Sequence, residues 1–418
     1  MKEYLDICPV DTLQVRITLP ASKSISNRAL LINALSSNVE IPQNVSDCDD
    51  TRVMLAALRD MPETIDIGAA GTAMRFLTAY LCVASGTHTI TGTERMRHRP
   101  IAVLVDALRS LGADVEYAGE EGFPPLRITG NGCLKGGELS LQGNVSSQYI
   151  SALLMIGPVL TDGLRLHLTG GIISRPYLDM TVTMMREFGA KVEWEGDDVV
   201  RVFPKPYTPR PYTIENDWSA ASYWYEMVAL SRDPNATVVL PGLCADSLQG
   251  DSFVSRIFDE LGVHTEWLCE GDGMEAVRLT KGGSLPACFR YDCSRQPDLA
   301  QTLVVTCAML GIPFELTGLQ TLRIKETDRI AALEAELGKL GIETESTDQT
   351  LVWKGCNKPT PTAPLPEIAT YEDHRMAMSF APACLRTGKL RVLHPEVVSK
   401  SYPTFWKDME KAGFSLQS

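Results

Sequence analysis

A run of charged residues at positions 323–329, RIKETDR, stands at the start of a helical pattern. Lys325 and Arg329 are four residues apart, so in a helix they would share one face of the first turn. Unpaired backbone N–H groups and the helix macrodipole favour anions there, and Glu326 lies beside the two cations. One such run alone is usually a solvated helix end with compensating charges. Anion binding is indicated only if other parts of the chain repeat the design.

Hydroxyls, glycines and charged side chains do recur at the predicted first turns of other helices. They are Ser22, Lys23, Ser24, Arg28, Gly71, Thr72, Arg99, Ser146, Ser147, Gln148, Ser174, Arg175, Asp298, Asp373, His374, Arg375 and Lys400. Such groups at helix N-termini are the components of a phosphate and carboxylate site. Ser, Thr and Asp could serve as N-caps alone. However, the helix dipole disfavours Lys and Arg at an N-terminus, so the cations predict an anionic ligand between them.

Two series of helices must position these residues. Segments that are apolar on most faces begin near residues 23, 71, 146, 217, 298 and 373, which predicts buried helices. Amphipathic helices end near Pro62 and before glycines at 112, 189, 262, 341 and 413, which predicts surface helices that turn into strands. The two series keep the same intervals, roughly 75 residues after a shorter first one. We therefore predict an α/β protein of six similar units.

Composition limits the classes of function. The 418 residues are 44% hydrophobic and 22% charged, which is typical of a globular chain of two or more domains. A net charge of -13 argues against nucleic-acid and anionic-membrane partners, so an anion site must be a local basic cluster. Eleven cysteines without CxxC pairs predict free thiols and no zinc site. With no apolar signal core in residues 1–19, and with the longest apolar run, residues 150–160, too short to span a bilayer, we expect a cytoplasmic protein.

Eight motifs, in this order along the whole chain, resemble the enolpyruvyl transferase family, in particular its branch that uses shikimate 3-phosphate. They are PASKSISNRALL, GTAMR, RMRHRPI, NVSSQYISALL, SRPYLDMT, RIKETDR, DHRMAM and SKSYPTF. No single motif is decisive, but the ordered set is very specific. The resemblance implies an α/β fold of two domains, each with three βαβαββ units around buried helices, as in an inside-out barrel. Residues 20–215 would form one domain, and residues 1–19 with 216–418 the other.

The resemblance also implies an activity and its site. The enolpyruvyl group of phosphoenolpyruvate would pass to the 5-hydroxyl of shikimate 3-phosphate, in aromatic amino acid biosynthesis, with release of phosphate and with no metal or organic cofactor. For shikimate 3-phosphate, the implied contacts are Lys23, Ser24, Arg28, Ser146, Ser147, Gln148, Ser174, Asp298 and Lys325. For phosphoenolpyruvate, they are Lys23, Gly71, Arg99, Gln148, Arg329, Arg375 and Lys400. Domain 20–215 would thus carry mainly the shikimate 3-phosphate contacts.

Addition of the enolpyruvyl group requires a base for the 5-hydroxyl and an acid for the methylene carbon. The resemblance implies Asp298 as the base and Glu326 as the acid, with Lys23 able to share either role. Fixed cations would also stabilise the phosphate that departs from the tetrahedral intermediate. A carboxylic acid among cations needs a pKa raised by burial to stay protonated.

Three features depart from the family pattern. Ala69 and Thr321 stand where an Asn often lies, and the segment between Leu58 and Gly68 is about a hairpin short. We expect Arg75 to be structural rather than to bind substrate. We also expect a monomer.

Two alternative functions remain open. The nearest is the sister transferase that acts on UDP-N-acetylglucosamine, which usually carries a reactive Cys before its Arg-Pro, whereas residues 94–99 here contain no Cys. A non-catalytic binder of sugar phosphates is the other, and the presence of both Asp298 and Glu326 argues against it. A P-loop kinase is unsupported, because the chain has no GxxxxGK[ST] motif.

Overall fold

The structure is a computed structural model that describes residues 3–37, 40–132, 134–269, 271, 273, 275–356 and 360–418. The chain divides into two compact units. The continuous unit is made of residues 21–214, and the split unit is made of Met1–Pro20 and Glu215–Ser418.

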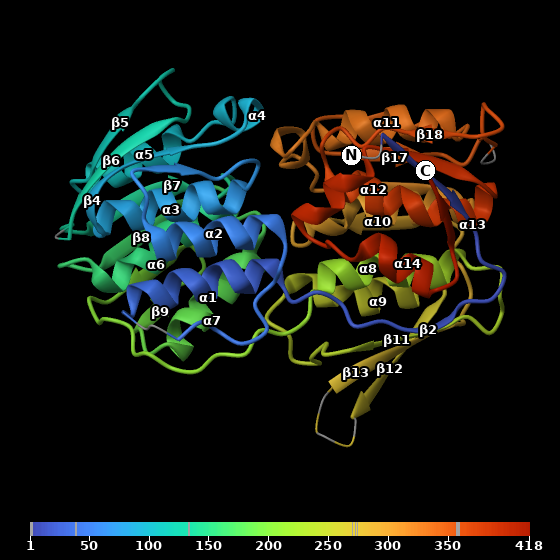
Figure 1. Ribbon diagram of the computed structural model, residues 1–418, viewed down its shortest axis with the longest axis horizontal. Coiled ribbons are helices and arrows are strands. Elements are labelled where there is room, and N and C mark those ends of the chain that lie inside the picture. The colour runs from blue at the N-terminus through green and yellow to red at the C-terminus, as the bar shows by residue number, and fades with distance from the viewer. Residues whose placement is uncertain are drawn as a thin grey trace. The chain divides into compact units, whose positions relative to one another are not determined.

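The continuous unit contains seven α-helices and eight strands among its described residues, drawn from blue to green in Figure 1. The helices are α1 (Lys23–Leu35), α2 (Asp49–Asp60), α3 (Gly71–Val83), α4 (Glu94–Arg97), α5 (Ala102–Ser110), α6 (Ser147–Ile156) and α7 (Arg175–Glu187), with the 3₁₀ helix η1 (Gly157–Val159). The strands are β3 (Thr64–Asp66), β4 (Ser85–Thr91), β5 (Asp114–Tyr117), β6 (Leu126–Asn131), β7 (Gly137–Gln142), β8 (Leu164–Thr169), β9 (Val192–Trp194) and β10 (Val199–Val202).

The split unit begins with β1 (Tyr4–Cys8) and β2 (Gln14–Arg16) and resumes after residue 214. Its helices are α8 (Trp218–Leu230), α9 (Val254–Asp259), α10 (Ala300–Leu310), α11 (Arg329–Lys339), α12 (His374–Phe380), α13 (Cys384–Thr387) and α14 (Phe405–Lys411). Its 3₁₀ helices are η2 (Gly250–Phe253), η3 (Pro297–Leu299), η4 (Leu322–Ile324), η5 (Ala381–Ala383) and η6 (Pro395–Lys400). Its later strands are β11 (Thr237–Pro241), β12 (Val263–Cys269), β13 (Glu275–Lys281), β14 (Phe289–Asp292), β15 (Phe314–Thr317), β16 (Glu345–Ser346), β17 (Leu351–Trp353), β18 (Glu367–Ile368), β19 (Leu390–Leu393) and β20 (Ser415–Gln417).

Five four-stranded sheets repeat one topology. Their orders are β3-β4-β6-β5, β7-β8-β10-β9, β2-β11-β13-β12, β14-β15-β17-β16 and β18-β19-β1-β20. In each sheet the first pair is parallel and the other two pairs are antiparallel. Parallel neighbours need a crossover, and a buried helix supplies it in four of these sheets, as α3 does between β3 and β4. Between β2 and β11 the chain runs through the whole continuous unit before it forms α8. The repeated topology confirms the internal repeat.

The first predicted unit differs from the other five. It keeps α1 and α2, but in place of a sheet its described residues include an isolated parallel bridge between Gln43 and Thr213. The starts of α1 and α3, at residues 23 and 71, are 48 residues apart, whereas later intervals are near 75. The missing length is that of the strands.

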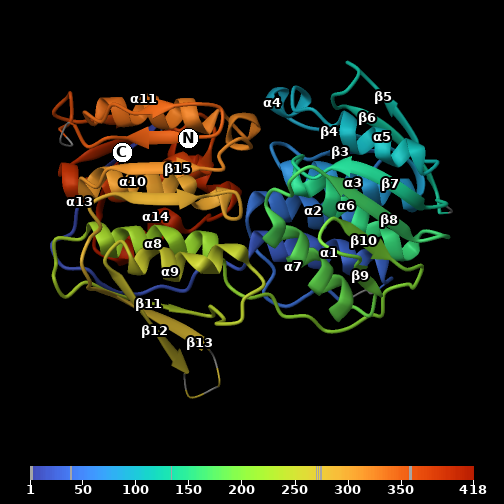
Figure 2. The ribbon, with the colours of Figure 1, turned by 180° about the vertical axis from the view of Figure 1, so that it is seen from behind.

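The two predicted helix series are both confirmed. The buried helices pack against one another within their units, α1 with α3 and α6, and α8 with α10 and α12 (Figure 1). Every residue of α8 except Ser219 is buried. The amphipathic helices lie outside them, and α9 joins α8 over the sheet of β11, β12 and β13 (Figure 2). The first turns of α3 and α6 meet through Gln148 and Thr72, and the start of α12 meets the residues just before α10 through Arg375 and Asp298.

The start of α11 was predicted wrongly. Asp328 caps this helix by accepting a hydrogen bond from the Ala331 N–H at 3.0 Å, so the helix begins at Arg329. Lys325 precedes it in an extended conformation. Lys325 and Arg329 therefore do not share one face of a helical turn. The reason is local, because Asp is a strong N-cap and fixes the first turn after itself.

Candidate active site

The first turns of α3 and α6 meet in the continuous unit. The Arg99 guanidinium lies against Gly71, so close that a Cβ added at Gly71 would stand 2.8 Å from Nη1. The Gln148 side chain donates a hydrogen bond to the Thr72 hydroxyl at 3.1 Å. In α6 every residue is buried except Ser147 and Gln148. Three predicted site residues, Gly71, Arg99 and Gln148, are thus brought to adjoining helix ends.

The contact between Gly71 and Arg99 gives a testable expectation. The resemblance implies that Gly71 and Arg99 contact phosphoenolpyruvate. On that basis we expect Gly71→Ala to displace the guanidinium and to weaken phosphoenolpyruvate binding about 10- to 100-fold, the range for one hydrogen bond to a charged group. Gly119→Ala is the control, because its added Cβ makes only an ordinary 3.4 Å contact with Pro125. Calorimetric titration of both variants measures the effect. If Gly71→Ala and Gly119→Ala bound phosphoenolpyruvate with equal dissociation constants, the Arg99 side chain would accommodate the added Cβ without loss of affinity.

Arg28 joins three helices. Its Nε donates to Thr181 Oγ1 of α7 at 2.7 Å, its Nη1 to the Ser24 carbonyl at 2.9 Å, and its Nη2 to Ser151 Oγ of α6 at 3.3 Å and to the Tyr177 carbonyl at 3.5 Å. A guanidinium has five N–H groups, so one on Nη1 is left for a ligand. Burial lowers the pKa of Arg28 to about 10, and the group stays charged at neutral pH. No described carboxylate forms an ion pair with it.

The serines predicted for phosphate differ in what they do. Ser146 is the N-cap of α6 and accepts a hydrogen bond from the Gln148 N–H at 3.3 Å. Ser174 precedes α7 with φ of 58° and makes no side-chain cap, so the N-cap explanation does not account for its hydroxyl. Ser174 is buried at the N-terminal end of α7, the helix whose Tyr177 carbonyl accepts a hydrogen bond from Arg28.

Lys23 opens α1 beside an acidic residue that the sequence analysis missed. Its Nζ lies 3.6 Å from Asp50 Oδ2, and the Asp50 side chain is only 4% exposed. Arg75 is structural, as expected. It donates to the Gly71 and Pro100 carbonyls at 3.2 and 3.4 Å and so ties α3 to the segment that carries Arg99.

A second group of charged residues gathers in the split unit. We call it the split-unit cluster, and it consists of Asp298, Lys325, Glu326, Arg329, Asp373, Arg375 and Lys400. Asp298, in η3, accepts from Arg329 Nη1 at 3.2 Å and lies 2.9 Å from Arg375 Nη2 and 3.9 Å from Lys325 Nζ. Its carboxylate therefore engages three cations.

Arg329 lies at the centre of this cluster and is 2% exposed. It donates to Asp373 at 2.7 Å, to Asp298 at 3.2 Å and to Glu326 at 3.0 Å. Burial alone would lower the pKa of Arg329, but these carboxylates raise it above its usual value. The other Glu326 oxygen accepts from Lys400 Nζ at 2.8 Å. All six residues of this unit predicted for the site are thus brought together, and Asp373 joins them.

Lys325 has a lowered pKa. Burial is the main cause and the charge of Arg329 adds to it, while Asp298 opposes the change. The Lys325 ammonium therefore loses its proton more readily than an exposed lysine does.

Asp251, in η2, is a further acidic residue near Asp298 that the sequence analysis missed. It is 3% exposed, its Oδ2 accepts a hydrogen bond from the Ser219 hydroxyl, and its Oδ1 is buried without a partner among the described residues. Burial, and then the negative charge of Asp298, raise the pKa of Asp251 to about 7. The motif LQGD just before an amphipathic helix was the available signal.

The raised pKa of Asp251 predicts a pH-dependent stability. Its stabilising contribution is fully present below the unfolded pKa of 3.8 and is lost as pH rises to about 7. A shift of this size corresponds to about 4 kcal/mol. We expect Asp251→Asn, which cannot ionise, to gain stability relative to the parent chain between pH 4 and 7. Thermal unfolding at pH 5 and pH 8 measures the difference in stability between Asp251→Asn and the parent chain. A difference that does not change with pH would contradict the raised pKa of Asp251.

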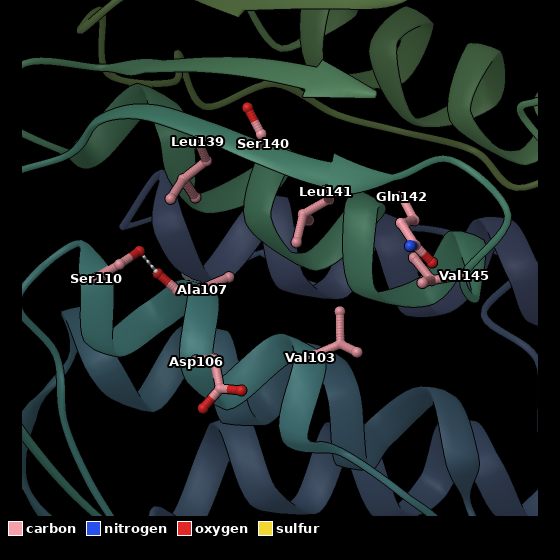
Figure 3. Close-up of a pocket in the computed structure, with 9 residues that line it drawn as sticks. All are labelled: Val103, Asp106, Ala107, Ser110, Leu139, Ser140, Leu141, Gln142 and Val145. Atoms are coloured by element: carbon pink, nitrogen blue, oxygen red, sulfur yellow. Dashed lines mark hydrogen bonds between the residues drawn. The ribbon is translucent and has the colours of Figure 1, made fainter. Parts of the chain in front are cut away.

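A groove of about 400 Å³ also lies in the continuous unit, between α5 and β7 (Figure 3). It is lined by Val103, Asp106, Ala107, Ser110, Leu139, Ser140, Leu141, Gln142 and Val145. Val103, Leu139 and Leu141 point toward one another across it (Figure 3). None of these described residues is Lys or Arg, so the groove does not suit a phosphate.

The ten described cysteines are free, and Cys133 lies outside the described residues. No helix in the described part of the chain is long and apolar enough to cross a membrane. Within the same residues, no group of three or more His, Cys, Asp and Glu side chains is placed to hold a metal ion.

The fold is that of the enolpyruvyl transferases. EPSP synthase from Acinetobacter baumannii matches with a TM-score of 0.75 at 24% identity, over 100% of both chains. The enolpyruvyl transferase NikO from Streptomyces tendae matches with a TM-score of 0.74 at 16% identity, over 99% of this chain and 98% of that chain.

The sequence comparisons then narrow the class. The family model for EPSP synthase (3-phosphoshikimate 1-carboxyvinyltransferase) matches residues 7–66 and 61–409. A 3-phosphoshikimate 1-carboxyvinyltransferase of Bacteroides fragilis is 56% identical over 97% of each chain, and one of Erwinia tasmaniensis is 34% identical over 98% of this chain and 99% of that one. The chain therefore belongs to the EPSP synthase family of transferases.

Proposed function

We propose that the protein transfers the enolpyruvyl group of phosphoenolpyruvate to the 5-hydroxyl of shikimate 3-phosphate and releases phosphate. Membership of the EPSP synthase family and the full-length relatives that carry this activity in their names support the proposal. The reaction is an addition followed by an elimination, and it needs no redox step.

We propose the following roles for the two units. The continuous unit binds shikimate 3-phosphate through Lys23, Ser24, Arg28, Ser146, Ser147, Gln148 and Ser174, and phosphoenolpyruvate through Lys23, Gly71, Arg99 and Gln148. The split unit contributes Asp298 and Lys325 toward shikimate 3-phosphate, and Arg329, Arg375 and Lys400 toward phosphoenolpyruvate. The single N–H left on Arg28 suits one carboxylate oxygen, and the hydroxyl of Ser174 is not used as a helix cap.

The observation that carries the proposal is the pair of carboxylates Asp298 and Glu326, held by one guanidinium. Arg329 lies 3.2 Å from one and 3.0 Å from the other. Asp298 acts as the base for the 5-hydroxyl and Glu326 as the acid for the methylene carbon, and Lys23 shares in proton transfer. The cations around them stabilise the departing phosphate.

Both oxygens of Glu326 accept hydrogen bonds from cations, Arg329 and Lys400. An anionic substrate that binds Lys400 competes with this ion pair. Substrate binding would thus leave one oxygen of Glu326 to face the substrate.

Phosphate release from phosphoenolpyruvate tests the proposal, with shikimate 3-phosphate and, separately, UDP-N-acetylglucosamine as acceptor. We expect release only with shikimate 3-phosphate. Release only with the other acceptor, or with neither, contradicts it. The lack of Cys in residues 94–99 and the names of the relatives disfavour the second acceptor.

We also propose that the protein acts in the cytoplasm as a monomer, without metal or organic cofactor. The ten free cysteines support a reducing compartment. Gel filtration with light scattering measures the oligomeric state, and a mass above the 45.8 kDa of one chain contradicts the proposal.

A further inference from the structure

The turn at residues 369–373 of the split unit has an unfavourable backbone conformation. Tyr371 and Glu372 have φ angles of 54° and 57°, in the left-handed region that residues with a Cβ seldom adopt. Two such residues in succession persist only where surrounding contacts determine them. The turn leads directly into α12, whose residues Asp373 and Arg375 belong to the split-unit cluster.

One carboxylate on α11 supplies contacts to this turn. Glu336 is fully buried. Its Oε1 accepts a hydrogen bond from the Tyr371 hydroxyl at 2.6 Å, and its Oε2 accepts from the Ala369 N–H at 3.1 Å. Lys339 Nζ also donates to Oε2 at 2.6 Å. A backbone group and a side chain of the turn thus bind a single buried carboxylate.

Helix α11 contacts the turn at two points. Arg329 and Glu336 are seven residues apart, which places them on one face of the helix about 10 Å apart along its axis. Arg329 binds Asp373 at 2.7 Å, while Glu336 binds Ala369 and Tyr371. The position of the turn is therefore set relative to the rest of the cluster.

On the other side of the turn, Arg375 reaches Asp298. Its Nη2 lies 2.9 Å from Asp298 Oδ2, and its Nη1 donates to the Asp298 carbonyl at 3.2 Å. The backbone N–H of Arg375 also binds Asp373 at 2.9 Å. A shift of the turn would therefore move the cation that orients Asp298.

We infer that Glu336 is a positioning residue, which fixes the turn at residues 369–373 and so sets the place of Arg375 beside Asp298. The inference rests on the proposed function, in which Arg375 binds phosphoenolpyruvate and Asp298 is the base. Glu336 itself touches neither substrate. Nothing in the motif DHRMAM points to it, since it lies 37 residues before Asp373 in the chain.

The hydrogen bond from Tyr371 keeps its direction across the neutral range. Burial, followed by the hydrogen bond to Glu336 and its charge, raises the pKa of Tyr371 to about 12. The hydroxyl is therefore a donor at every pH at which the protein would be assayed. Removal of that hydroxyl is the smallest change that tests the contact.

We expect Tyr371→Phe to lower kcat/KM for phosphoenolpyruvate about tenfold, the lower range for a hydrogen bond to a charged group. The KM for phosphoenolpyruvate should account for most of the loss, with the KM for shikimate 3-phosphate unchanged. Tyr225→Phe is the matched control, because it removes a hydroxyl that bonds to Thr265 at 3.0 Å in the same unit but outside the turn. Tyr225→Phe should change neither kcat/KM nor KM for phosphoenolpyruvate.

A rescue separates positioning from general stability. Glycine adopts positive φ without penalty, and Glu372 is exposed, so Glu372→Gly relieves the turn. Added to Tyr371→Phe, it should restore at least part of the affinity for phosphoenolpyruvate. If the Tyr371 hydroxyl were merely structural, Tyr371→Phe and Tyr225→Phe would both lower the melting temperature and both leave the KM for phosphoenolpyruvate unchanged. That result would overturn the inference.

Hydrogen–deuterium exchange gives a readout that does not depend on turnover. Peptides that cover residues 369–376 should exchange faster in Tyr371→Phe and Glu336→Gln than in the parent chain or Tyr225→Phe. If the parent chain turns over neither acceptor, the proposed function fails and exchange alone decides whether Glu336 fixes the turn. Unchanged exchange overturns the inference in either case, as does an unchanged KM for phosphoenolpyruvate in an active enzyme.

Discussion

Replacement of Glu326 by Gln is expected to lower turnover by about 10²- to 10⁴-fold, the usual contribution of a positioned acid or base. Gln keeps the length and one acceptor of the side chain but cannot deliver a proton. In the structure one oxygen binds Arg329 and the other binds Lys400, so the amide loses one of these two bonds. Steady-state assays of phosphate release measure the effect.

Binding measurements distinguish the acid from a mere ion-pair partner. Calorimetric titration should find near-normal affinity of Glu326→Gln for shikimate 3-phosphate, because the contacts proposed for that substrate lie elsewhere. Glu343→Gln, an exposed change in the same unit, serves as the control for loss of a charge. Unchanged turnover in Glu326→Gln would reduce Glu326 to a structural partner of its cations.

The largest expected effect on stability is that of Arg329→Met. This change leaves Asp373, which is fully buried, and two nearby carboxylates without their shared cation. Removal of one partner from a buried ion pair costs about 3–5 kcal/mol. Chemical unfolding of Arg329→Met and of the parent chain measures the loss of stability.

Arg290→Met is the matched control. Arg290 pairs with Glu315 at 3.2 Å, but the two side chains are 72% and 47% exposed. Exposed pairs contribute at most about 1 kcal/mol. If both variants lost the same stability, burial would not be the source of the effect at Arg329.

The helices could be predicted from the sequence because their signal is local. The apolar stretches of α6, α8 and α10, and the glycines that follow the surface helices after α2, recur at nearly constant intervals. The absence of strands from the first unit was harder to predict, because only the short interval before Gly71 indicated it. The early start assigned to α11 overlooked Asp328, which stands four residues after Ile324 and caps the helix.

The site was predictable only in part. The cations and serines at helix starts carry a signal, since the helix dipole makes Lys and Arg unusual there. Their acidic partners carry a weaker signal. Asp373 stands at a predicted helix start and Asp251 ends the motif LQGD, but Asp50, Asp251 and Asp373 matter through contacts with residues far along the chain. Asp251 acts on Asp298, which is 47 residues away, and Asp373 binds Arg329, which is 44 residues away. Such pairs depend on how the units fold.

The place of β1 in the split unit has a consequence for synthesis of the chain. β1 lies between β19 and β20, and Asp6 binds Arg391, 385 residues later. A ribosome releases the first strand long before either neighbour exists, whereas residues 21–214 emerge together and can complete their own core. The opening segment must therefore remain unpaired until β19 is made. Contacts between residues so far apart in the chain carry a high entropic cost of loop closure and favour slow folding, so we expect this sheet to close late.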